Sequence, residues 1–327
     1  MSSIIYRNDS EEFDSVIHSL ISGLDWVSVD HGQEYLNYHY CRHSLQSDVT
    51  DISFVVSLED KYKIAAIGLV SNDEQINDPP IIVYESNYPM LDKLRKDFLL
   101  EFEKVIDKYK SKNIIIRDFV IDGKLSFFSK YLLRKGAISY PMFHQVINLK
   151  QPIEIIKKNI RKSYKSLINY STSYLDIQVF DSDNITHELI MKIMNLHTSI
   201  VGHSTRPLEL WTMQYNLVKN NCAFVVVGLY KKNIVSAGIF GFNHTNCIYQ
   251  MSISDRSMFS KPMFHGLMMK AIDNAIELGC NWFEIGEQVF LNHPIDIRPS
   301  KKEIDISSFK AGFGNETRMF LDLKLEC

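Results

Sequence analysis

The sequence predicts an α/β (α+β) protein with two successive lobes, each a mixed, mostly antiparallel sheet flanked by helices. The second half reads as three strands, a helix and a strand, and the first half has the same order. A local similarity supports a repeat, because Phe54-Val55-Val56 recurs as Phe224-Val225-Val226. We therefore expect two lobes, formed by residues 1–150 and 151–327.

Length and composition fit a globular protein of this size. The 327 residues suffice for two ordinary domains. A formal net charge of −3 argues against a globally basic nucleic-acid binder, although a local basic patch remains compatible with it. The 5 cysteines are scattered and form no C-x-x-C pair, which argues against a zinc site or a disulfide framework.

The sequence contains no recognisable targeting or membrane-spanning segment. Its first residues lack the cationic and apolar regions of a signal peptide. No apolar run approaches the roughly 18 residues that a spanning helix needs. We therefore expect a cytoplasmic protein with no integral membrane segment.

The strands of the second half are short, apolar and separated by tight polar turns, which is typical of an antiparallel meander. Apolar residues then recur at helical spacing between a proline suited to a first turn and a glycine suited to a helix end. The expected elements are strands at residues 224–230, 234–242 and 247–254, a helix between Pro262 and Gly279, and a strand at 281–286.

The first half repeats this pattern and is followed by a basic helix. Residues 137–149, at its end, read as paired strands, and a further helix is expected from Ile153 to about Leu167. That helix carries Lys157, Lys158, Arg161, Lys162 and Lys165 on one face. The expected elements before it are strands at residues 52–58, 63–70, 81–84 and 114–120, and a helix from about Pro89 to Tyr109.

Four stretches of the second half occur in a characteristic order. They are Asn159–Ser171, Arg206-Pro207 followed by Trp211, Phe264–Gly286, and Ser308–Gly314 with the pattern S-F-K-x-G-F-G. Together they resemble GNAT-superfamily acyltransferases with tandem lobes. They are similar in particular to Fem-type peptidoglycan aminoacyltransferases and related envelope and polysaccharide N-acyltransferases. The resemblance implies a catalytic second lobe and a first lobe that serves as scaffold and acceptor wall.

One segment departs from the pattern of CoA-dependent GNAT enzymes. Those enzymes have a glycine-rich pyrophosphate loop before the helix, whereas Asp255–Lys261 reads DRSMFSK. Glycines let backbone N–H groups approach phosphate oxygens closely. The resemblance therefore leaves three kinds of co-substrate open: acyl-CoA, an acyl carrier protein and aminoacyl-tRNA.

Lys310 is the first candidate for the chemistry of acyl transfer. By resemblance to the family's F-K-x-x-F-G signature, its ammonium would stabilise the tetrahedral oxyanion or the leaving oxygen. Gly312 and Gly314 would let the chain turn tightly beside it. An exposed lysine at the start of a strand is the alternative interpretation.

Several side chains are candidates for binding substrate. Arg161, Lys162 and Lys165 would hold phosphates of a nucleotide-linked or lipid-linked acceptor or of tRNA, unless they only form a solvated helix face. Arg206 and Trp211 would contact the acceptor, unless they are a loop arginine and a core tryptophan. The set is completed by Tyr249, Gln250 and Arg256, around the end of the third strand.

The general base has several candidates, namely Asp255, His265, Glu284 and Glu287. His265 lies near a helix N-terminus, which favours its neutral form. Glu284 and Glu287 would point to opposite faces of a regular strand, because their spacing is odd. We expect Asp255, His265 and Glu287 to serve the chemistry beside Lys310, although an acceptor phosphate is an alternative base.

The expected function is transfer of an acyl group from a thioester donor to an amine acceptor, such as an amino sugar or amino acid of an envelope precursor. An aminoacyl-tRNA-dependent Fem-type transferase is an alternative from the same class. A non-catalytic protein that binds nucleotide-linked or lipid-linked sugars is an alternative from another class. No metal and no resident cofactor is expected.

Overall fold

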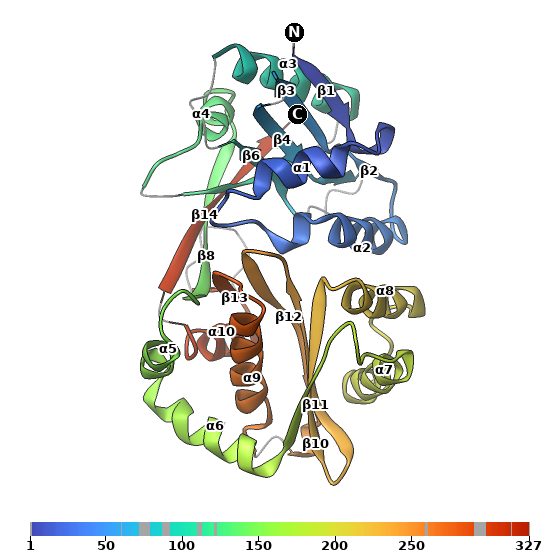
Figure 1. Cartoon of the computed structure of the whole chain (residues 1–327), viewed down its shortest axis with the longest axis vertical. Coiled ribbons are helices and arrows are strands. Elements are labelled where there is room, and N and C mark those ends of the chain that lie inside the picture. Colours follow the sequence, from blue (N-terminus) through green and yellow to red (C-terminus); the bar gives the residue numbers. More distant parts are fainter. Residues whose placement is uncertain are drawn as a thin grey trace. The chain divides into compact units, whose positions relative to one another are not determined.

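The structure is a computed structural model that describes residues 2–59, 61–71, 79–86, 92–109, 113–120, 123–258, 261–290, 299–314 and 316–326. The chain forms two compact units (Figure 1). Unit 1 comprises Met1–Met142 together with Met319–Cys327, and unit 2 comprises Phe143–Arg318. Each unit has its own apolar core.

Unit 1 is built around sheet strands in the order β1-β3-β4-β6-β7-β14. Its strands pair antiparallel, except for the parallel pair of β6 and β7. Its elements are β1 (Ser3–Tyr6), η1 (Arg7–Asp9), α1 (Phe13–Ile21), η2 (Val29–His31), α2 (Gln33–Ser44), β2 (Val49–Asp51), β3 (Phe54–Leu58), β4 (Tyr62–Ile67), β5 (Leu69–Ser71), β6 (Ile81–Glu85), α3 (Asp92–Tyr109), β7 (Asn113–Phe119), α4 (Phe127–Arg134) and most of β14 (Glu316–Glu326).

Both faces of this sheet are apolar because helices cover both of them. Alternate residues of a strand point to opposite faces. Phe54 and Val56 accordingly pack in one cluster with Phe98 of α3, whereas Val55 packs in another with Phe13 of α1. This burial on two sides explains why β3 reads as a continuous apolar run in place of an alternating pattern.

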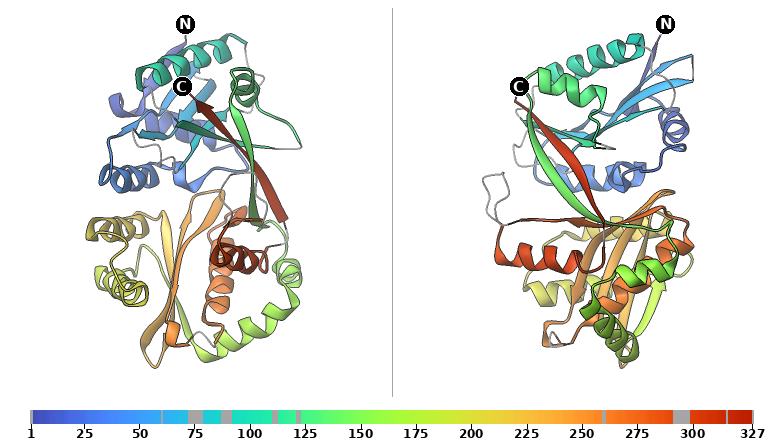
Figure 2. Two further views of the ribbon diagram at one scale, coloured as in Figure 1. Left: turned by 180° about the vertical axis from the view of Figure 1, so that it is seen from behind. Right: turned by 90° about the vertical axis from the view of Figure 1, so that its left-hand side faces the viewer.

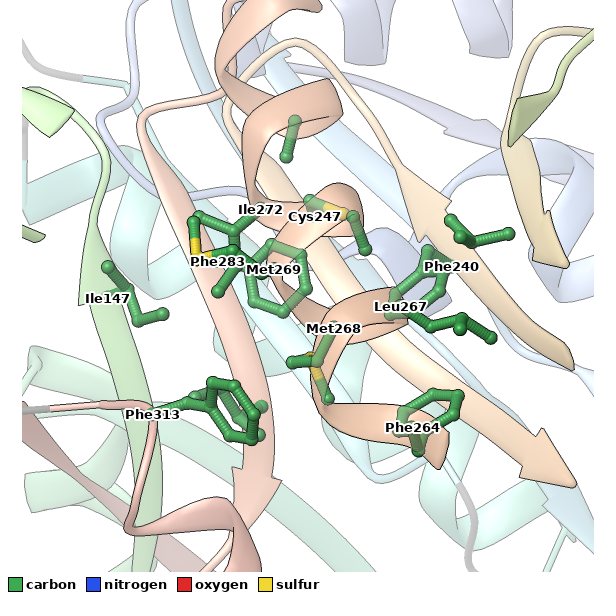
Figure 3. Packing of buried hydrophobic residues seen from close by; sticks show 14 of the residues in the cluster. Ile147, Phe240, Cys247, Phe264, Leu267, Met268, Met269, Ile272, Phe283 and Phe313 are labelled. Atoms are coloured by element: carbon green, nitrogen blue, oxygen red, sulfur yellow. The ribbon is translucent and has the colours of Figure 1, made fainter. Parts of the chain in front are cut away.

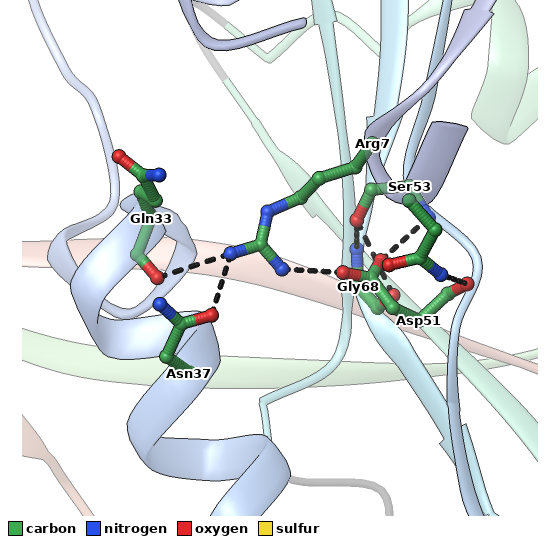
Figure 4. Close-up of polar contacts among 7 residues, drawn as sticks. Arg7, Gln33, Asn37, Asp51, Ser53 and Gly68 are labelled. Carbon is green, nitrogen blue, oxygen red and sulfur yellow. Dashed lines mark hydrogen bonds and ion pairs between the residues drawn. The ribbon is translucent and has the colours of Figure 1, made fainter. Parts of the chain in front are cut away.

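A polar network fixes the end of β1 within unit 1 (Figure 4). The guanidinium of Arg7 forms an ion pair with Asp51 and donates to the Asn37 side-chain oxygen at 2.7 Å and to the Gln33 carbonyl at 3.3 Å. Asp51 in turn accepts a hydrogen bond from the backbone N–H of Ser53 at 2.8 Å. Arg7 thus ties α2 to the strands that begin the sheet.

Unit 2 is built around sheet strands in the order β8-β13-β12-β11-β10-β9. Among the described strands of this unit, only β12 and β13 pair in parallel. Its elements are the end of β8 (Ile138–Asn148), α5 (Ile153–Asn159), α6 (Lys162–Tyr174), β9 (Asp176–Phe180), α7 (His187–Val201), α8 (Leu208–Lys219), β10 (Ala223–Tyr230), β11 (Asn233–Phe242), β12 (Asn246–Ser254), η3 (Arg256–Met258), α9 (Met263–Glu277), β13 (Trp282–Glu287) and α10 (Lys301–Lys310).

Helix α9 is the centre of the unit 2 core. Leu267, Met268 and Ile272 of this helix pack against Phe240 and Phe283 of the sheet (Figure 3). Helix α6 covers α9, and α7 and α8 pack on the sheet from the other face (Figures 1 and 2). Because α9 lies between the sheet and α6, it is apolar around most of its circumference.

Each unit is completed by a strand from the other half of the sequence. Strand β8 follows β7 and α4 in the chain, yet its residues His144–Asn148 pair with β13 in unit 2. Strand β14 follows β13 and α10, yet its residues Phe320–Glu326 pair with β7 in unit 1. The units therefore differ from the expected division at residue 150 by an exchange of their last strands.

The predicted fold class is confirmed, with three local corrections. The helix expected from Ile153 to about Leu167 is two helices, because Ile160 and Arg161 are extended at ψ 136° and 130°. Residues 137–149 contain one long strand, β8, in place of paired strands. The strand expected at 63–70 is divided between β4 and β5, and β5 pairs with β2 in a separate sheet.

Other expected elements agree closely with the observed ones. The meander, the helix after Pro262 and the strand after it correspond to β10, β11, β12, α9 and β13. The helix expected from about Pro89 is α3, and residues 87–91 lie outside the described part of the chain. Among the described residues, no helix combines the length and the apolar character that crossing a membrane requires.

Candidate active site

The sheet of unit 2 opens between its two parallel strands. Asn246–Ile248 of β12 pair with Trp282–Glu284 of β13, and the two strands pair no further, although β12 continues to Ser254 and β13 to Glu287. The register of β12 on β11 shifts at Gln250, between the pairs Ile239–Met251 and Phe240–Tyr249. Bulges of this kind redirect strands and are frequent beside active sites.

Gly286 lies on β13 just after Glu284, the last residue of that strand to pair with β12. It is in close contact with the side chain of Lys310. Its backbone has φ +114°, a conformation that side chains with a Cβ rarely adopt. A Cβ on Gly286 would lie 2.7 Å from the Lys310 Nζ, so the ammonium rests directly against this glycine. Lys310 is the last residue of α10, so this helix places the ammonium beside β13.

Two carboxylates of β13 act on the Lys310 ammonium. The register of β13 on β8 shifts between Glu284 and Gly286, so the strand is not regular there. Burial lowers the pKa of Lys310, and the charges of Glu287 and Glu284 partly oppose that effect. Although the two glutamates have an odd spacing, the charges of both therefore raise the pKa of the same ammonium.

His144 joins this group from strand β8. Its Nδ1 is hydrogen-bonded to Glu284 Oε1, and its side chain is buried. His144 was not among the residues predicted from the sequence, because the pairing of β8 with β13 joins residues that are far apart in the chain. No local pattern around residue 144 indicated this contact.

The turn after α10 is held by close backbone packing. A Cβ on Gly312 would lie 2.1 Å from the ring of Tyr164, and a Cβ on Gly314 would lie 2.6 Å from Gln145 Cγ. The Gly312 carbonyl accepts a hydrogen bond from the Arg161 N–H at 2.9 Å. Neither glycine has a positive φ, so close approach is the reason for both.

His265 belongs to an aromatic cluster beside this turn. Its ring lies edge-on to Tyr164 with centroids 4.6 Å apart, and 5.3 Å from the centroid of Phe309. Burial lowers the pKa of His265 to about 4, although the Pro262 backbone partly opposes that shift. The imidazole is therefore neutral near pH 7 and has a weaker affinity for protons than an ordinary histidine.

The residues around the end of β12 have different surroundings. Burial raises the pKa of Tyr249 to about 12, and its hydroxyl is hydrogen-bonded to Ser252. Asp255 accepts a hydrogen bond from the Ser257 N–H at 2.9 Å and so caps the turn η3. Arg256 is exposed in that turn, and Gln250 is half-buried in the bulge of β12.

The remaining predicted residues fall into two groups within unit 2. Arg161 donates to the Ser308 carbonyl at 3.1 Å, whereas Lys162 and Lys165 are exposed on α6. Arg206 lies over Trp211, 5.7 Å from the ring centroid. Trp211 is only 1% exposed, so most of its surface serves packing.

The structure thus brings only part of the predicted set together. Lys310 and Glu287 share the site at Gly286 with Glu284, and Arg161 and His265 flank the turn that follows Lys310. Among the described residues, no group of His, Cys, Asp and Glu side chains is arranged to hold a metal ion.

Neither a protein-family model nor a curated protein matches this sequence. Solved structures do match it. FemX superposes with a TM-score of 0.68 at 10% identity, covering 98% of this chain and 96% of FemX. L-PGS from Bacillus licheniformis gives a TM-score of 0.55 at 11% identity, covering 97% of this chain and 92% of L-PGS.

A tandem GNAT protein from the clavulanic acid biosynthesis pathway gives a TM-score of 0.53 at 11% identity, covering 99% of this chain and 97% of that protein. Identities this low establish the fold alone. The likeness extends over nearly the full length of each of these proteins. This chain therefore shares its fold with FemX and with this tandem GNAT protein.

Proposed function

We propose that this chain is an N-acyltransferase. It would move an acyl group from a thioester, either acyl-CoA or an acyl carrier protein, to an amine acceptor such as an amino sugar or amino acid of an envelope precursor. The observation that carries this proposal is the Lys310 ammonium, which rests on Gly286 where β12 and β13 have separated. The likeness in fold to a tandem GNAT protein supports a transferase.

The charges at this site suit the steps of acyl transfer. A neutral amine attacks the thioester carbonyl, a C–N bond forms, and negative charge develops on the carbonyl oxygen. Lys310 would stabilise that oxyanion, because a preorganised cation acts strongly where water is largely excluded. The intermediate then collapses, the C–S bond breaks, and the thiol leaves.

Glu287 is the proposed base for the amine proton. Glu284 is engaged by His144, and the pKa of His265 near 4 leaves that imidazole a weak proton acceptor. Glu287 would take the proton from the attacking nitrogen and return it to the departing sulfur, which leaves the carboxylate unchanged after each cycle. Because Glu287 lies beside Lys310, its carboxylate would receive the proton while the Lys310 ammonium stabilises the oxyanion.

An aminoacyl-tRNA-dependent transferase is the second candidate. The described residues between β12 and α9, Asp255–Met258 and Lys261-Pro262, contain no glycine that would bring backbone N–H groups close to a pyrophosphate. This observation favours a donor held by other groups. The same lysine and carboxylate would serve, with an ester oxygen leaving in place of a thiol.

A thermal-shift screen of the purified chain tests the donor, because a ligand that binds only the folded state raises the Tm. The panel contains acetyl-CoA, longer acyl-CoAs, a loaded acyl carrier protein, aminoacyl-tRNA and nucleotide-linked amino sugars. We expect a shift with a thioester donor. A shift with aminoacyl-tRNA alone would favour the second candidate, and a shift with sugars alone would favour a non-catalytic binding protein.

A further inference from the structure

Three tyrosines gather at the surface of unit 2 where α6 ends. Tyr170 and Tyr174 are one turn apart on α6, and Tyr230 is the last residue of β10. Their rings are nearly parallel, with centroids 5.6 Å apart for Tyr170 and Tyr174 and 4.6 Å apart for Tyr174 and Tyr230. Tyr170 is 42% exposed, so this row of rings is open to solvent at one end.

Lysines surround the same rings. The Lys261 ammonium is hydrogen-bonded to the Tyr174 hydroxyl and lies 4.0 Å from that ring's centroid and 5.7 Å from that of Tyr230. Lys231 lies 5.4 Å from the Tyr230 centroid. Within the described part of the chain, no carboxylate forms an ion pair with either lysine, so their positive charge is available to a ligand.

The cluster lies beside the start of α9, in the same unit as Lys310. Lys261 directly precedes Pro262, the residue at which α9 begins, and α9 follows the strand β12 that borders the opening in the sheet. The segment before α9 has no glycine among its described residues, but it has this lysine between two tyrosine rings. Cations and aromatic rings are therefore present beside a segment whose described residues include no glycine.

Aromatic rings beside cations are suited to a nucleotide. A planar base stacks on aromatic rings, and lysines neutralise phosphates. We propose that Tyr170, Tyr174, Tyr230 and Lys261 form a platform for an adenosine that carries phosphate. This choice of base rests on the proposed function, because such an adenosine is the group that CoA and the 3′ end of a tRNA share.

Binding of three probes to the whole chain tests the platform. The probes are adenosine 3′,5′-bisphosphate, CoA and a short RNA that ends in CCA, each titrated by calorimetry. We expect Tyr170→Ala and Lys261→Gln each to weaken bisphosphate binding by at least about fivefold. Tyr40→Ala is the matched control, because Tyr40 is 44% exposed and lies on α2 of unit 1.

The probes also distinguish the two sources of the adenosine. Tighter binding of CoA than of the RNA assigns the platform to a CoA donor, and the reverse order assigns it to tRNA. Unchanged affinity in both variants, or no binding of any probe to the wild-type chain, would overturn the platform. Thermal unfolding of each variant confirms that it is folded.

Failure of the platform and failure of the proposed function are separable. If wild-type protein transfers acyl groups while both variants bind the probes normally, the platform is wrong and the function stands. If the bisphosphate binds in a manner that depends on Tyr170 and Lys261 but no acyl transfer occurs, the platform stands and the function is wrong.

Discussion

Lys310 is placed where removal of its charge should affect chemistry more than folding. It is half-buried at the end of α10, and its ammonium rests on Gly286. We predict that Lys310→Ala lowers kcat by about 100-fold or more and leaves donor binding nearly unchanged, because the charge acts on the oxyanion. Steady-state kinetics with the donor found by thermal shift checks this, with exposed Lys301→Ala on the same helix as control.

An unchanged kcat in Lys310→Ala would remove this lysine from the reaction. A higher KM at constant kcat would assign it to substrate binding, because such an effect reports interactions made equally in ground and transition states.

The pH dependence follows from the surroundings of the same ammonium. Burial lowers the pKa of Lys310, while Glu287 and Glu284 raise it, and the oxyanion role needs the protonated form. Glu284→Gln removes a charge that favours protonation, so the pKa of Lys310 should fall further. We predict that the alkaline limb of the kcat profile moves to lower pH in Glu284→Gln. An identical limb in wild type and variant would contradict the electrostatic link, and exposed Asp305→Asn on α10 is the control.

Gly286 has both a positive φ and a close contact with Lys310. Comparison with a second glycine that has only the positive φ separates the effects of the two features. Gly286 has φ +114° and meets Lys310, whereas Gly279 has φ +79° and open space around it. We predict that Gly286→Ala and Gly279→Ala each cost about 1 kcal/mol of stability from backbone strain. Only Gly286→Ala should also lower kcat, because it displaces the ammonium. Denaturant unfolding and kinetics on both variants measure the two effects, and equal kcat values would disconnect Gly286 from function.

The sequence predicted some members of this site and could not predict others. Lys310 and Glu287 were expected from the motif and from the ends of strands, and their catalytic roles stay predictions. The bulge at Gly286 escaped notice because a glycine inside a strand does not specify its own φ. His144 was missed because its contact with Glu284 depends on which strand β8 pairs with.

Helix α6 and the turn after α10 fit together through a single glycine. A Cβ at Gly312 would lie 2.1 Å from the buried ring of Tyr164, and the backbone there has no positive φ. We predict that Gly312→Ala destabilises the protein by about 1–3 kcal/mol through overpacking. The smaller side chain of Tyr164→Val should offset part of that loss in the double variant. Denaturant unfolding of the four proteins gives the coupling, and additive effects would show that the two elements do not press on each other.

Apolar spacing predicted the existence of the elements better than their ends. The spacing of Ile153, Ile156, Ile160 and Tyr164 suggested one helix, since all four are buried or nearly so. The chain nevertheless becomes extended at Ile160 and Arg161, where the Arg161 N–H bonds to the Gly312 carbonyl. A tertiary hydrogen bond thus divides a pattern that is locally continuous.

At the scale of the whole molecule, the exchange of β8 and β14 makes each unit depend on both halves of the sequence. A fragment of residues 1–150 lacks β14 and leaves β7 without that neighbour, and a fragment of residues 151–327 lacks β8 beside β13. We predict that neither fragment unfolds cooperatively alone and that co-expression restores a stable complex. Circular dichroism with urea titration measures this. A cooperative transition in either isolated fragment would contradict the dependence.

The order of elements was predictable over most of the chain, but the exchange was not. Periodicity reports whether a segment is apolar on one face or on both, and β8 and β14 would look the same with either partner. The observed pairing of β14 with β7 includes an ion pair between Arg117 and Asp322, which are 205 positions apart in the chain. Such a distant pairing leaves no mark on either local pattern.

The exchange of β14 also affects when unit 1 can finish folding during synthesis. A ribosome adds residues from the N-terminus onward, and domains commonly fold as they emerge. Here β7 pairs with Phe320–Glu326, which are synthesised roughly two hundred residues after it. The sheet that contains β7 is therefore incomplete until these last residues have emerged. During that interval β7 presents an unpaired edge, the kind of surface on which nascent chains recruit chaperones or associate wrongly.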